Sequence, residues 1–301
     1  MSVNRVETVV VVGAGLMGTG IAHAFATAGR VTLMVDVDSR ALERALGAID
    51  KILADGTRRG KLAPEDAERA RARITAHGDL AAVLKSTEVD LLLETAAESL
   101  AVKTSIIVLA DPLLPPHAVI ATNTSALSVT EIGAASSRPD RVVGMHFFNP
   151  VHKMKLVEIV RALGTSDDTV MRARDWVQAV GKTSIVVNEA PGLTTSRMSA
   201  LVGNEAMYML QEGTASAEDI DTALRLGFNH PMGPIELGDL TGWDTRLAVL
   251  QYLHATLGEK YRPCPLIIKL VQSGRTGRKA GRGVYEYKDG ERVPGSGLRP
   301  H

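Results

Sequence analysis

One histidine and one glutamate lie within two apolar runs that a short turn separates. His146 lies in residues 142–148, Asn149-Pro150 form the turn, and Glu158 lies in residues 156–160. Apolar runs of this length on either side of a turn predict two buried strands. If the chain folds back, Glu158 can accept a hydrogen bond from one imidazole nitrogen of His146, which leaves the other nitrogen free to exchange a proton. The pattern predicts an acid–base pair, and a structural histidine bonded to the backbone is the alternative.

A glycine-rich turn follows the first predicted strand. The β-branched run at residues 8–12 leads into G-x-G-x-x-G at residues 13–18 and then into a helical pattern. The glycines permit the tight turn, close approach to a pyrophosphate and packing of helix on strand, and the helix N-terminus faces the negative charge. After a second strand at residues 31–35, Asp36 can bond ribose hydroxyls and would repel a 2′-phosphate, which predicts NAD rather than NADP. A helix-starting turn followed by a surface aspartate is the alternative.

The strands and helices alternate over the first part of the chain. Further strands are predicted at residues 89–93, 118–121 and 183–187, with a helix at 167–180 and a charged helical hairpin at 39–73 whose turn is at 55–61. Polar residues follow two of these strands: Glu98 and Lys103 after one, and the cluster 122–125 after the other. Because ligands bind at the carboxyl ends of strands in a doubly wound sheet, these residues are candidates for cofactor contact. The alternatives are a helix-starting Glu98 with an exposed Lys103, and an ordinary turn.

The pattern changes after residue 188, where helices replace the alternation. Helices are predicted at residues 193–211, 217–227, 244–257 and 266–273, with a rigid turn at 229–234. The fold class is therefore α/β: a Rossmann-like doubly wound sheet with a helical-hairpin insertion at 1–188, and an all-α C-terminal domain at 189–301. The helix at 193–211 is apolar around most of its circumference, so we expect it to be buried between the domains or against a second subunit. A short strand at 284–287 precedes a polar tail that we expect to fray.

Composition excludes several classes of partner. The 301 residues include 34 basic and 34 acidic side chains, so no net field would draw the chain to nucleic acid or to an anionic membrane. Cys264 is the single cysteine, which excludes an internal disulfide and fits a reducing compartment. No signal-peptide pattern and no apolar run of roughly 20 residues is present, so we expect a cytoplasmic protein without a membrane span. No metal site is predicted.

The same residues occur together in a known family. From Gly13 to Tyr287 the chain resembles the short-chain L-3-hydroxyacyl-CoA dehydrogenases, most closely the bacterial 3-hydroxybutyryl-CoA dehydrogenases. The most specific stretches are residues 144–151, 155–160, 230–237 and 277–285. The resemblance implies NAD as cofactor, an acyl-CoA thioester as substrate, and a homodimer formed through the C-terminal domain.

The resemblance also implies roles for individual residues. His146 matches the general base, Glu158 its orienting partner, and Ser125 the serine that bonds the substrate's 3-oxygen. The implied NAD contacts are Gly13, Gly15, Leu16, Met17, Gly18, Asp36, Glu98, Lys103, Ser125, Asn149 and Lys279. For coenzyme A the family uses a basic residue in the helical hairpin, and Arg59 is the nearest match. A solvated charged face is the alternative interpretation of that hairpin turn.

One position departs from the family pattern. Residues 191–197 have Ser196 where the family has an asparagine that donates to the substrate's carbonyl region. Ser196 offers one donor on a shorter arm, acting through a water or with Thr195. Loss of a well-placed donor of this type can cost roughly 100- to 1,000-fold in rate. The departure therefore bears on catalytic efficiency or substrate choice.

The activity implied is reversible NAD-linked oxidation of an L-3-hydroxyacyl-CoA to the 3-oxoacyl-CoA, with His146 as acid–base. Two alternatives are a dehydrogenase of free 3-hydroxy acids and an NAD-binding protein without turnover. Retention of Ser125, His146 and Glu158 together argues against the second.

Overall fold

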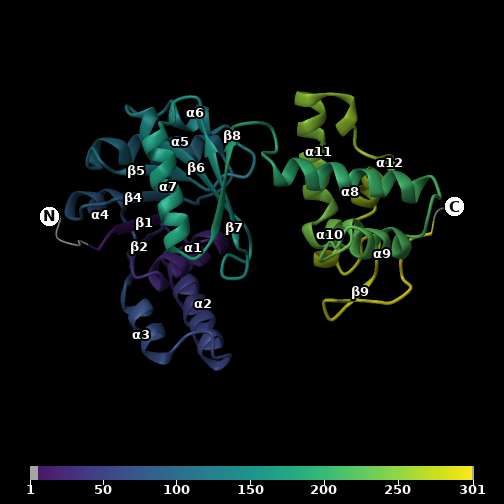
Figure 1. The fold of residues 1–301 in the computed structure, drawn as a ribbon, viewed down its shortest axis with the longest axis horizontal. Helices are drawn as coiled ribbons and strands as arrows, with labels where there is room; N and C mark the ends of the chain where they lie inside the picture. The colour runs from purple at the N-terminus through teal and green to yellow at the C-terminus, as the bar shows by residue number, and fades with distance from the viewer. Residues whose placement is uncertain (1–5, 300–301) are drawn as a thin grey trace. The chain divides into compact units, whose positions relative to one another are not determined.

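The computed structural model describes residues 6–299, which form two compact units (Figure 1). The first unit ends at Glu189 and the second begins at Ala190. The outer ends of the predicted domains, residues 1–5 and 300–301, lie outside this description.

An eight-stranded sheet organises the first unit, in the order β3-β2-β1-β4-β5-β6-β7-β8. The strands are β1 Thr8–Val12, β2 Val31–Val35, β3 Ile74–His77, β4 Leu91–Glu94, β5 Val119–Thr122, β6 Val142–Phe147, β7 Leu156–Arg161 and β8 Thr183–Asn188. Neighbouring strands are parallel except that β7 runs antiparallel to β6. The doubly wound sheet predicted from the sequence is thus confirmed.

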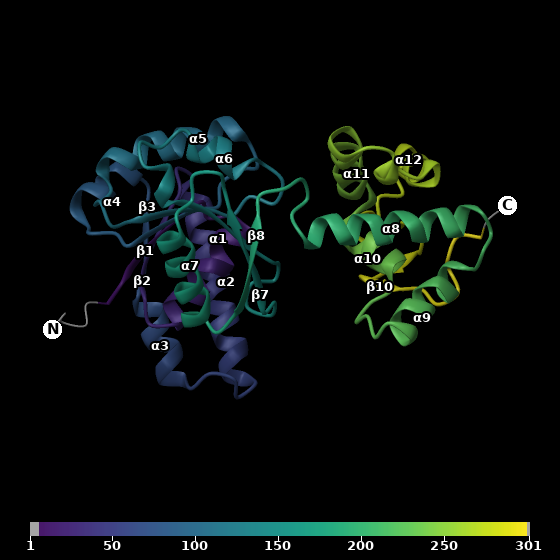
Figure 2. The same ribbon diagram turned by 45° about the horizontal axis from the view of Figure 1, so that its top comes forward.

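Helices cover both faces of this sheet (Figures 1 and 2). One face carries α1 Leu16–Thr27, α2 Ser39–Arg58, α3 Pro64–Ala72 and α7 Asp167–Ala179; the other carries α4 Leu80–Ser86, α5 Leu100–Ala110 and α6 Val129–Gly133. Two 3-10 turns, η1 Asp111–Leu113 and η2 Pro139–Arg141, precede β5 and β6.

The main core lies between the sheet and the helices α1 and α7. Alternate strand residues such as Val9, Val11 and Leu93 are buried there against Phe25 of α1 and Trp176 of α7. Each large side chain buried in this way contributes about 1.5–3 kcal/mol. This packing sets the position of α1, whose N-terminus lies at the carboxyl end of β1.

The helical hairpin differs from the prediction in the position of its turn. The Asp-Gly pair at residues 55–56 is typical of a turn, but α2 continues through Gly56 and ends at Arg58. Its buried side chains, Leu42, Ala45, Ile49 and Leu53, recur every three to four residues, and this amphipathic packing outweighs the cost of about 1 kcal/mol for a glycine in a helix. The edge strand β3 and the short helix α4 were not predicted from the sequence.

The second unit is mainly helical, as predicted. Its helices are α8 Thr195–Gln211, α9 Ala217–Gly227, α10 Pro234–Thr241, α11 Trp243–Leu257 and α12 Pro265–Gln272, with 3-10 turns η3 Glu259–Tyr261 and η4 Arg278–Ala280. The short helix α10 was not predicted. Within the unit, α8 buries Ala200, Gly203 and Met207, whereas Met198 is exposed. Burial of its remaining apolar surface by another domain or subunit stays a prediction.

The C-terminal segment is more ordered than predicted. Only Tyr287 of the expected strand lies in β9 Tyr287–Lys288, which pairs with β10 Glu291–Arg292 in a two-stranded sheet. The N–H of Leu298 donates to the Val284 carbonyl at 3.0 Å, so the tail folds back instead of fraying.

A buried carboxylate holds this segment to α10. Asp239 accepts hydrogen bonds from the backbone N–H groups of Val284 and Tyr285 and from Trp243 Nε1. A side chain at Gly283 would put its Cβ 1.9 Å from Asp239 Oδ1, so only glycine fits there.

Within residues 6–299, no helix is both long and apolar enough to cross a membrane. The same residues contain no cluster of three or more histidine, cysteine or acidic side chains suited to a metal ion.

Candidate active site

The glycine turn is shaped by close backbone contacts. Gly13 has a φ of +105°, and a Cβ there would lie 2.9 Å from the Thr95 carbonyl carbon. A Cβ on Gly18 would lie 1.9 Å from the Gly13 oxygen. By contrast, no heavy atom lies within 4 Å of the Cβ position of Gly15. Gly13 and Gly18 are therefore required by the protein's own packing. Gly15 faces open space at the N-terminus of α1, where a pyrophosphate would approach.

Asp36 stands beside this turn. One carboxylate oxygen accepts the Ala14 N–H at 2.7 Å, and the other accepts the Asp38 N–H at 2.9 Å. The carboxylate is thus fixed at the end of β2, next to the turn, where it can meet a ribose and oppose a 2′-phosphate. Of the other residues predicted in the turn, Leu16 is exposed and Met17 packs against the core. These residues fit NAD.

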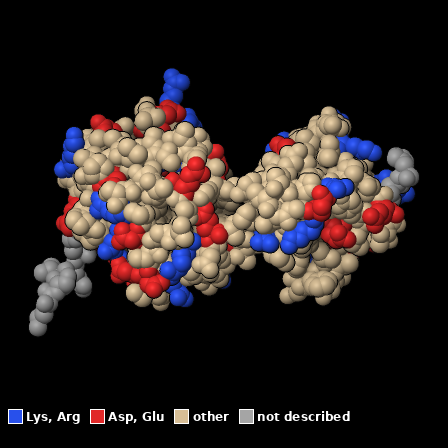
Figure 3. All heavy atoms as spheres, turned by 90° about the horizontal axis from the view of Figure 1, so that it is seen from above, with Lys and Arg blue, Asp and Glu red and all other residues tan. Residues whose placement is uncertain are grey.

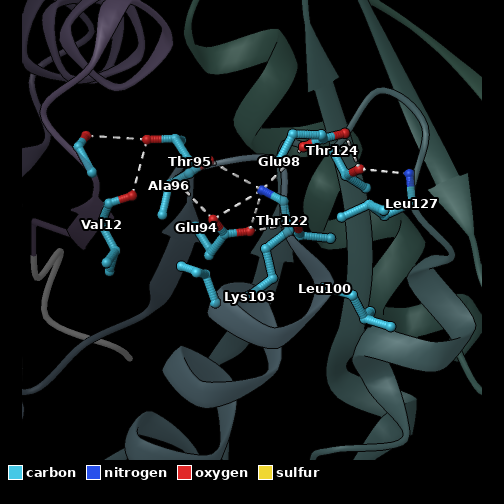
Figure 4. A network of polar contacts seen from close by, with 12 residues as sticks. Val12, Glu94, Thr95, Ala96, Glu98, Leu100, Lys103, Thr122, Thr124 and Leu127 are labelled. Atoms are coloured by element: carbon cyan, nitrogen blue, oxygen red, sulfur yellow. Dashed lines mark hydrogen bonds and ion pairs between the residues drawn. The ribbon is translucent and has the colours of Figure 1, made fainter. Parts of the chain in front are cut away.

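A buried ion pair lies at the end of β4 (Figure 4). Lys103, 1% exposed, reaches from α5 to within 3.0 Å of both carboxylate oxygens of Glu94, which is 0% exposed. Thr122 Oγ1 donates to the same carboxylate at 2.7 Å, and Lys103 also approaches Glu98 at 3.4 Å. The alternative of an exposed Lys103 is therefore wrong, and its proposed contact with NAD stays a prediction.

Glu98 orders the turn that carries Ser125. Its Oε1 accepts from Thr124 Oγ1 at 2.6 Å and from the Ser125 N–H at 2.9 Å. Burial raises the pKa of Glu98, but these hydrogen bonds and the charge of Lys103 outweigh it, so the pKa lies below its usual value. Ser125 Oγ lies 3.3 Å from the same carboxylate oxygen. A charged Glu98 therefore positions Ser125 at the end of β5.

The register of β6 and β7 sets His146 directly opposite Glu158. His146 Nδ1 lies 2.8 Å from Glu158 Oε2, and both side chains are buried, Glu158 completely. The Phe148 ring packs 4.6 Å from the imidazole, centroid to centroid. A carboxylate at this distance favours the tautomer with a proton on Nδ1, which leaves Nε2 as the basic nitrogen. The predicted strand–turn–strand arrangement is present, and it places His146 beside Glu158.

The roles of four other predicted residues stay predictions. Asn149 is exposed just after β6. Arg59 caps the C-terminus of α2 and pairs with Asp55 at 2.8 Å, and Arg58 pairs with the same carboxylate, so part of the positive charge of the hairpin turn is neutralised. Ser196 and Lys279 belong to the second unit: Ser196 lies in the first turn of α8, and Lys279 Nζ contacts Asp244 at 2.7 Å. Their parts in a site stay predictions.

Two residues have a positioning role that was not predicted from the sequence, although Asn123 lies in the polar cluster 122–125 that was a candidate for cofactor contact. Asn123 Oδ1 accepts the Phe147 N–H at 2.8 Å and so ties β5 to the end of β6 next to His146. Glu94 anchors Lys103. The sequence feature that could have identified Glu94 is its position as an acidic residue at the end of an otherwise apolar strand. A charge in that setting is expected to have a partner.

The sequence matches one family of known proteins over both units. Residues 8–190 match the NAD-binding domain of 3-hydroxyacyl-CoA dehydrogenase, and residues 192–287 match its C-terminal domain. The chain belongs to the 3-hydroxyacyl-CoA dehydrogenase family. It is 42% identical to a probable 3-hydroxybutyryl-CoA dehydrogenase of Bacillus subtilis, over 95% of this chain and 99% of the relative. Identity to the 3-hydroxybutyryl-CoA dehydrogenase of Bradyrhizobium diazoefficiens is 40%, over 96% and 98%.

Solved structures agree with the family assignment. The crystal structure of (S)-3-hydroxybutyryl-CoA dehydrogenase from Ralstonia eutropha superposes with a TM-score of 0.90 at 40% identity, over 95% of this chain and 100% of the other. The chain is thus an NAD-dependent dehydrogenase of this family, and the predicted resemblance, fold class and cofactor are confirmed.

Proposed function

We propose that this dehydrogenase interconverts short-chain L-3-hydroxyacyl-CoA and 3-oxoacyl-CoA, with 3-hydroxybutyryl-CoA as the substrate of choice. The buried His146–Glu158 pair carries the proposal, because it provides a proton acceptor in the same sheet as a dinucleotide-binding turn. The names of the relatives in Bacillus and Bradyrhizobium support the chain length.

The proton moves through His146. In the oxidative direction Nε2 accepts the proton of the substrate's 3-hydroxyl, which converts His146 to an imidazolium. Glu158 stabilises this cation through its hydrogen bond with Nδ1. The glycine turn and Asp36 would hold NAD, which would supply the hydride acceptor for C3. Ser125 donates a hydrogen bond to the reacting oxygen, and Glu98 holds the turn that presents it. In the reductive direction the same groups return the proton.

The remaining residues bind the two ligands in this proposal. The turn at 13–18 and Asp36 hold the dinucleotide, together with Glu98, Lys103, Ser125, Asn149 and Lys279. Arg59 meets the nucleotide part of the CoA thioester, and Ser196 takes the position of the family asparagine. The second unit, which contains Ser196 and Lys279, serves as substrate and dimerisation domain, so the working form is a homodimer. Cys264 is buried and has no second cysteine in the chain to pair with, which suits a reducing cytoplasmic compartment.

NADH-linked reduction of acetoacetyl-CoA tests the proposal, run beside free acetoacetate and beside NADPH as donor. We expect turnover with the thioester and NADH and little with the other combinations. Faster turnover of the free acid would favour the free-acid dehydrogenase, and no turnover despite NADH binding would contradict an enzymatic role.

A further inference from the structure

A buried arginine lies between two helices of the second unit. Arg246 belongs to the first turn of α11, which packs across α8 (Figures 1 and 2). Arg246 is 5% exposed, and its Nη1 donates to Ser199 Oγ of α8 at 3.0 Å. A Cβ on Gly203 would lie 3.8 Å from Arg246 Nε, so the guanidinium lies directly over this glycine. It therefore occupies the face of α8 that carries Ser199 and Gly203.

This guanidinium has no counter-charge within residues 6–299. Burial is the one influence that shifts its pKa, so no carboxylate acts on it at close range. The buried carboxylates described in the same unit are engaged elsewhere. Asp221 accepts from the Tyr285 hydroxyl at 2.7 Å, and Asp239 accepts from Trp243 Nε1 at 2.5 Å. Neither of them can serve as the partner of the arginine.

The positive charge of Arg246 is retained despite its burial. Burial lowers the pKa of Arg246 to about 10, which still leaves the group protonated at neutral pH. A buried charge is expected to have a partner. Its position adds to the cost, because the helix dipole disfavours a cation in the first turn of α11. The folded unit therefore holds a positive charge that an anion would stabilise.

Cations elsewhere in the chain show the usual pairing. Lys103 of the first unit is buried to a similar extent, and Glu94 holds it at 3.0 Å. In the second unit Lys279 meets Asp244 at 2.7 Å. Basic and acidic side chains are interspersed on the face of the second unit that Figure 3 shows. Arg246 differs from these cations because its partner has to come from outside the unit.

One nitrogen of the guanidinium can be reached by a ligand. Nη1 is engaged by Ser199, and Nε is enclosed without a hydrogen-bond partner in the described part of the chain. Nη2 has no hydrogen bond to residues 6–299 and is not enclosed as Nε is, so it can donate to an incoming oxygen. Ser199 accepts from Nη1, which leaves its own hydroxyl proton to donate. Two neighbouring donors of this kind match the two oxygens of a carboxylate.

Ser199 places these donors near the acyl part of the proposed substrate. It follows Ser196 by three positions in α8, so the two side chains lie on one face of the helix with Cβ atoms about 5–6 Å apart. Ser196 is the residue proposed to meet the substrate's carbonyl region. An acyl chain that runs from Ser196 along this face brings its far end to Arg246, whereas the nucleotide leaves from the opposite end of the thioester.

We propose that Arg246 and Ser199 bind a carboxylate at the far end of the acyl chain, so that the enzyme also reduces CoA thioesters of 3-oxo dicarboxylic acids. The inference rests on the proposed function and widens its substrate range. The reaction at C3 is the one already proposed, so no further co-reactant is needed. A phosphate is a poorer match, because it would bring up to two negative charges to a single guanidinium.

NADH-linked reduction of 3-oxoadipyl-CoA and 3-oxohexanoyl-CoA by the full-length protein tests the site. The two acyl chains have the same length, and one ends in a carboxylate where the other ends in a methyl group. We expect kcat/KM to be at least about tenfold higher for 3-oxoadipyl-CoA, because a charge-assisted hydrogen bond forms with a guanidinium that is already desolvated. A ratio of one or below would overturn the proposal.

Variants assign the preference to the arginine. Arg246→Met removes the charge and should bring the ratio to about one, Arg246→Lys should keep part of it, and Ser199→Ala should lower it about threefold. Arg225→Met, at an exposed arginine of α9, is the matched control and should leave the ratio unchanged. Urea unfolding should show Arg246→Met to be at least as stable as wild type, since an unpaired buried charge is gone. An unchanged ratio together with a lower stability or an altered oligomeric state would overturn the site, because the guanidinium would then pair with another subunit.

Reduction of acetoacetyl-CoA separates this proposal from the function on which it rests. Wild type that reduces acetoacetyl-CoA without preferring the carboxylated thioester would lose the carboxylate site alone. Failure to reduce any of the three thioesters would overturn the proposed function. Calorimetric titration with adipyl-CoA and hexanoyl-CoA would then still test the site without turnover, and equal affinities for the two would overturn it.

Discussion

The two ends of the same strands carry polar clusters that are satisfied in opposite ways. At the amino ends of β5 and β6, Asp111 accepts from Ser136 Oγ, from both the N–H and Oγ of Ser137, and from Arg138 Nε. Arg138 also donates to nearby backbone carbonyls. At the carboxyl ends, His146 is held by Glu158 through one nitrogen and keeps the other for exchange. A cluster that saturates its own donors and acceptors stabilises the fold, whereas one that leaves a group open can do chemistry.

The Glu94–Lys103 pair shows that location alone does not decide the role. It lies at the carboxyl end, yet the carboxylate is enclosed by Lys103, Thr122 and the Ala96 N–H. By the criterion of saturation it belongs with Asp111, although it lies at the same end as His146. Five substitutions test this division.

Replacing His146 with Gln removes the proton acceptor but leaves a polar side chain of similar size. We expect kcat to fall about 10²- to 10⁴-fold, the usual contribution of general acid–base catalysis, while the Kd for NADH stays within about twofold. Steady-state assays and NADH titration measure both quantities, with His254→Gln as control. Joint collapse of activity and NADH binding would show that His146 has a structural role.

Lys103→Met should lower stability in addition to any weakening of NADH binding. Removing one member of a buried pair leaves an uncompensated charge and costs about 3–5 kcal/mol of unfolding free energy. Urea unfolding measures this, with exposed Lys85→Met as a control expected to stay within about 0.5 kcal/mol. The double variant with Glu94→Gln should recover part of the loss. Near-native stability together with weakened NADH binding would mean that Lys103 serves cofactor binding and not the fold.

Glu158→Gln keeps the shape of the acid–base pair and removes its charge. Loss of a charge-assisted hydrogen bond of about 1.5–3 kcal/mol corresponds to a fall in kcat of roughly 10- to 150-fold. The unfolding midpoint measures whether the fold is retained. A variant that turns over at the wild-type rate is incompatible with the proposed stabilisation of the imidazolium.

Asp111→Asn tests the saturated cluster through pH. Burial raises the pKa of Asp111, but the hydrogen bonds from Ser137 and Arg138 prevail and lower it to about 2. Because the folded pKa lies below the unfolded value, the charged form contributes about 2 kcal/mol above pH 4, and this contribution is lost as the pH falls from about 4 to 2.

The free energy of unfolding should therefore be higher for wild type than for Asp111→Asn at pH 7, and the difference between them should be smaller at pH 3. Asp167→Asn, at an exposed aspartate paired with Arg161, should show almost no gap at either pH. A gap of constant size would mean that the charge of Asp111 contributes nothing.

Asp36→Asn should have the smallest effect. The amide oxygen can still accept the Ala14 N–H, but the charge that opposes a 2′-phosphate is gone. We expect the preference for NADH over NADPH to fall about tenfold, measured as the ratio of kcat/KM values. A preference that does not change would restrict Asp36 to holding the glycine turn.

The features that followed from the sequence are those set by local pattern. The glycine turn, the apolar strands and the facing of His146 and Glu158 depend on residues close in the chain, so periodicity and turn residues were enough. The edge strand β3 was missed because Thr75 and Ala76 are exposed and give no apolar run. The helix α10 was missed because it is short and contains Gly238, which the Trp243 ring requires to be small.

The rest of the site depends on contacts between distant residues. Glu98 reaches Ser125 across 27 positions, and Glu94 meets Thr122 across 28, through the pairing of β4 with β5. No local spacing encodes which acidic residue serves which turn.

The antiparallel pairing of β6 and β7 makes the acid–base pair independent of the loop between them. The backbone pairing of β6 with β7 sets His146 opposite Glu158, and the pairing of β7 with β8 holds β7 from its other edge. Residues 152–155 of this loop can therefore vary in sequence without moving either residue of the pair, whereas Phe148 packs on the His146 ring and Val151 is buried in the core. Relatives could therefore differ at these loop positions and still inherit the proton-transfer pair unchanged.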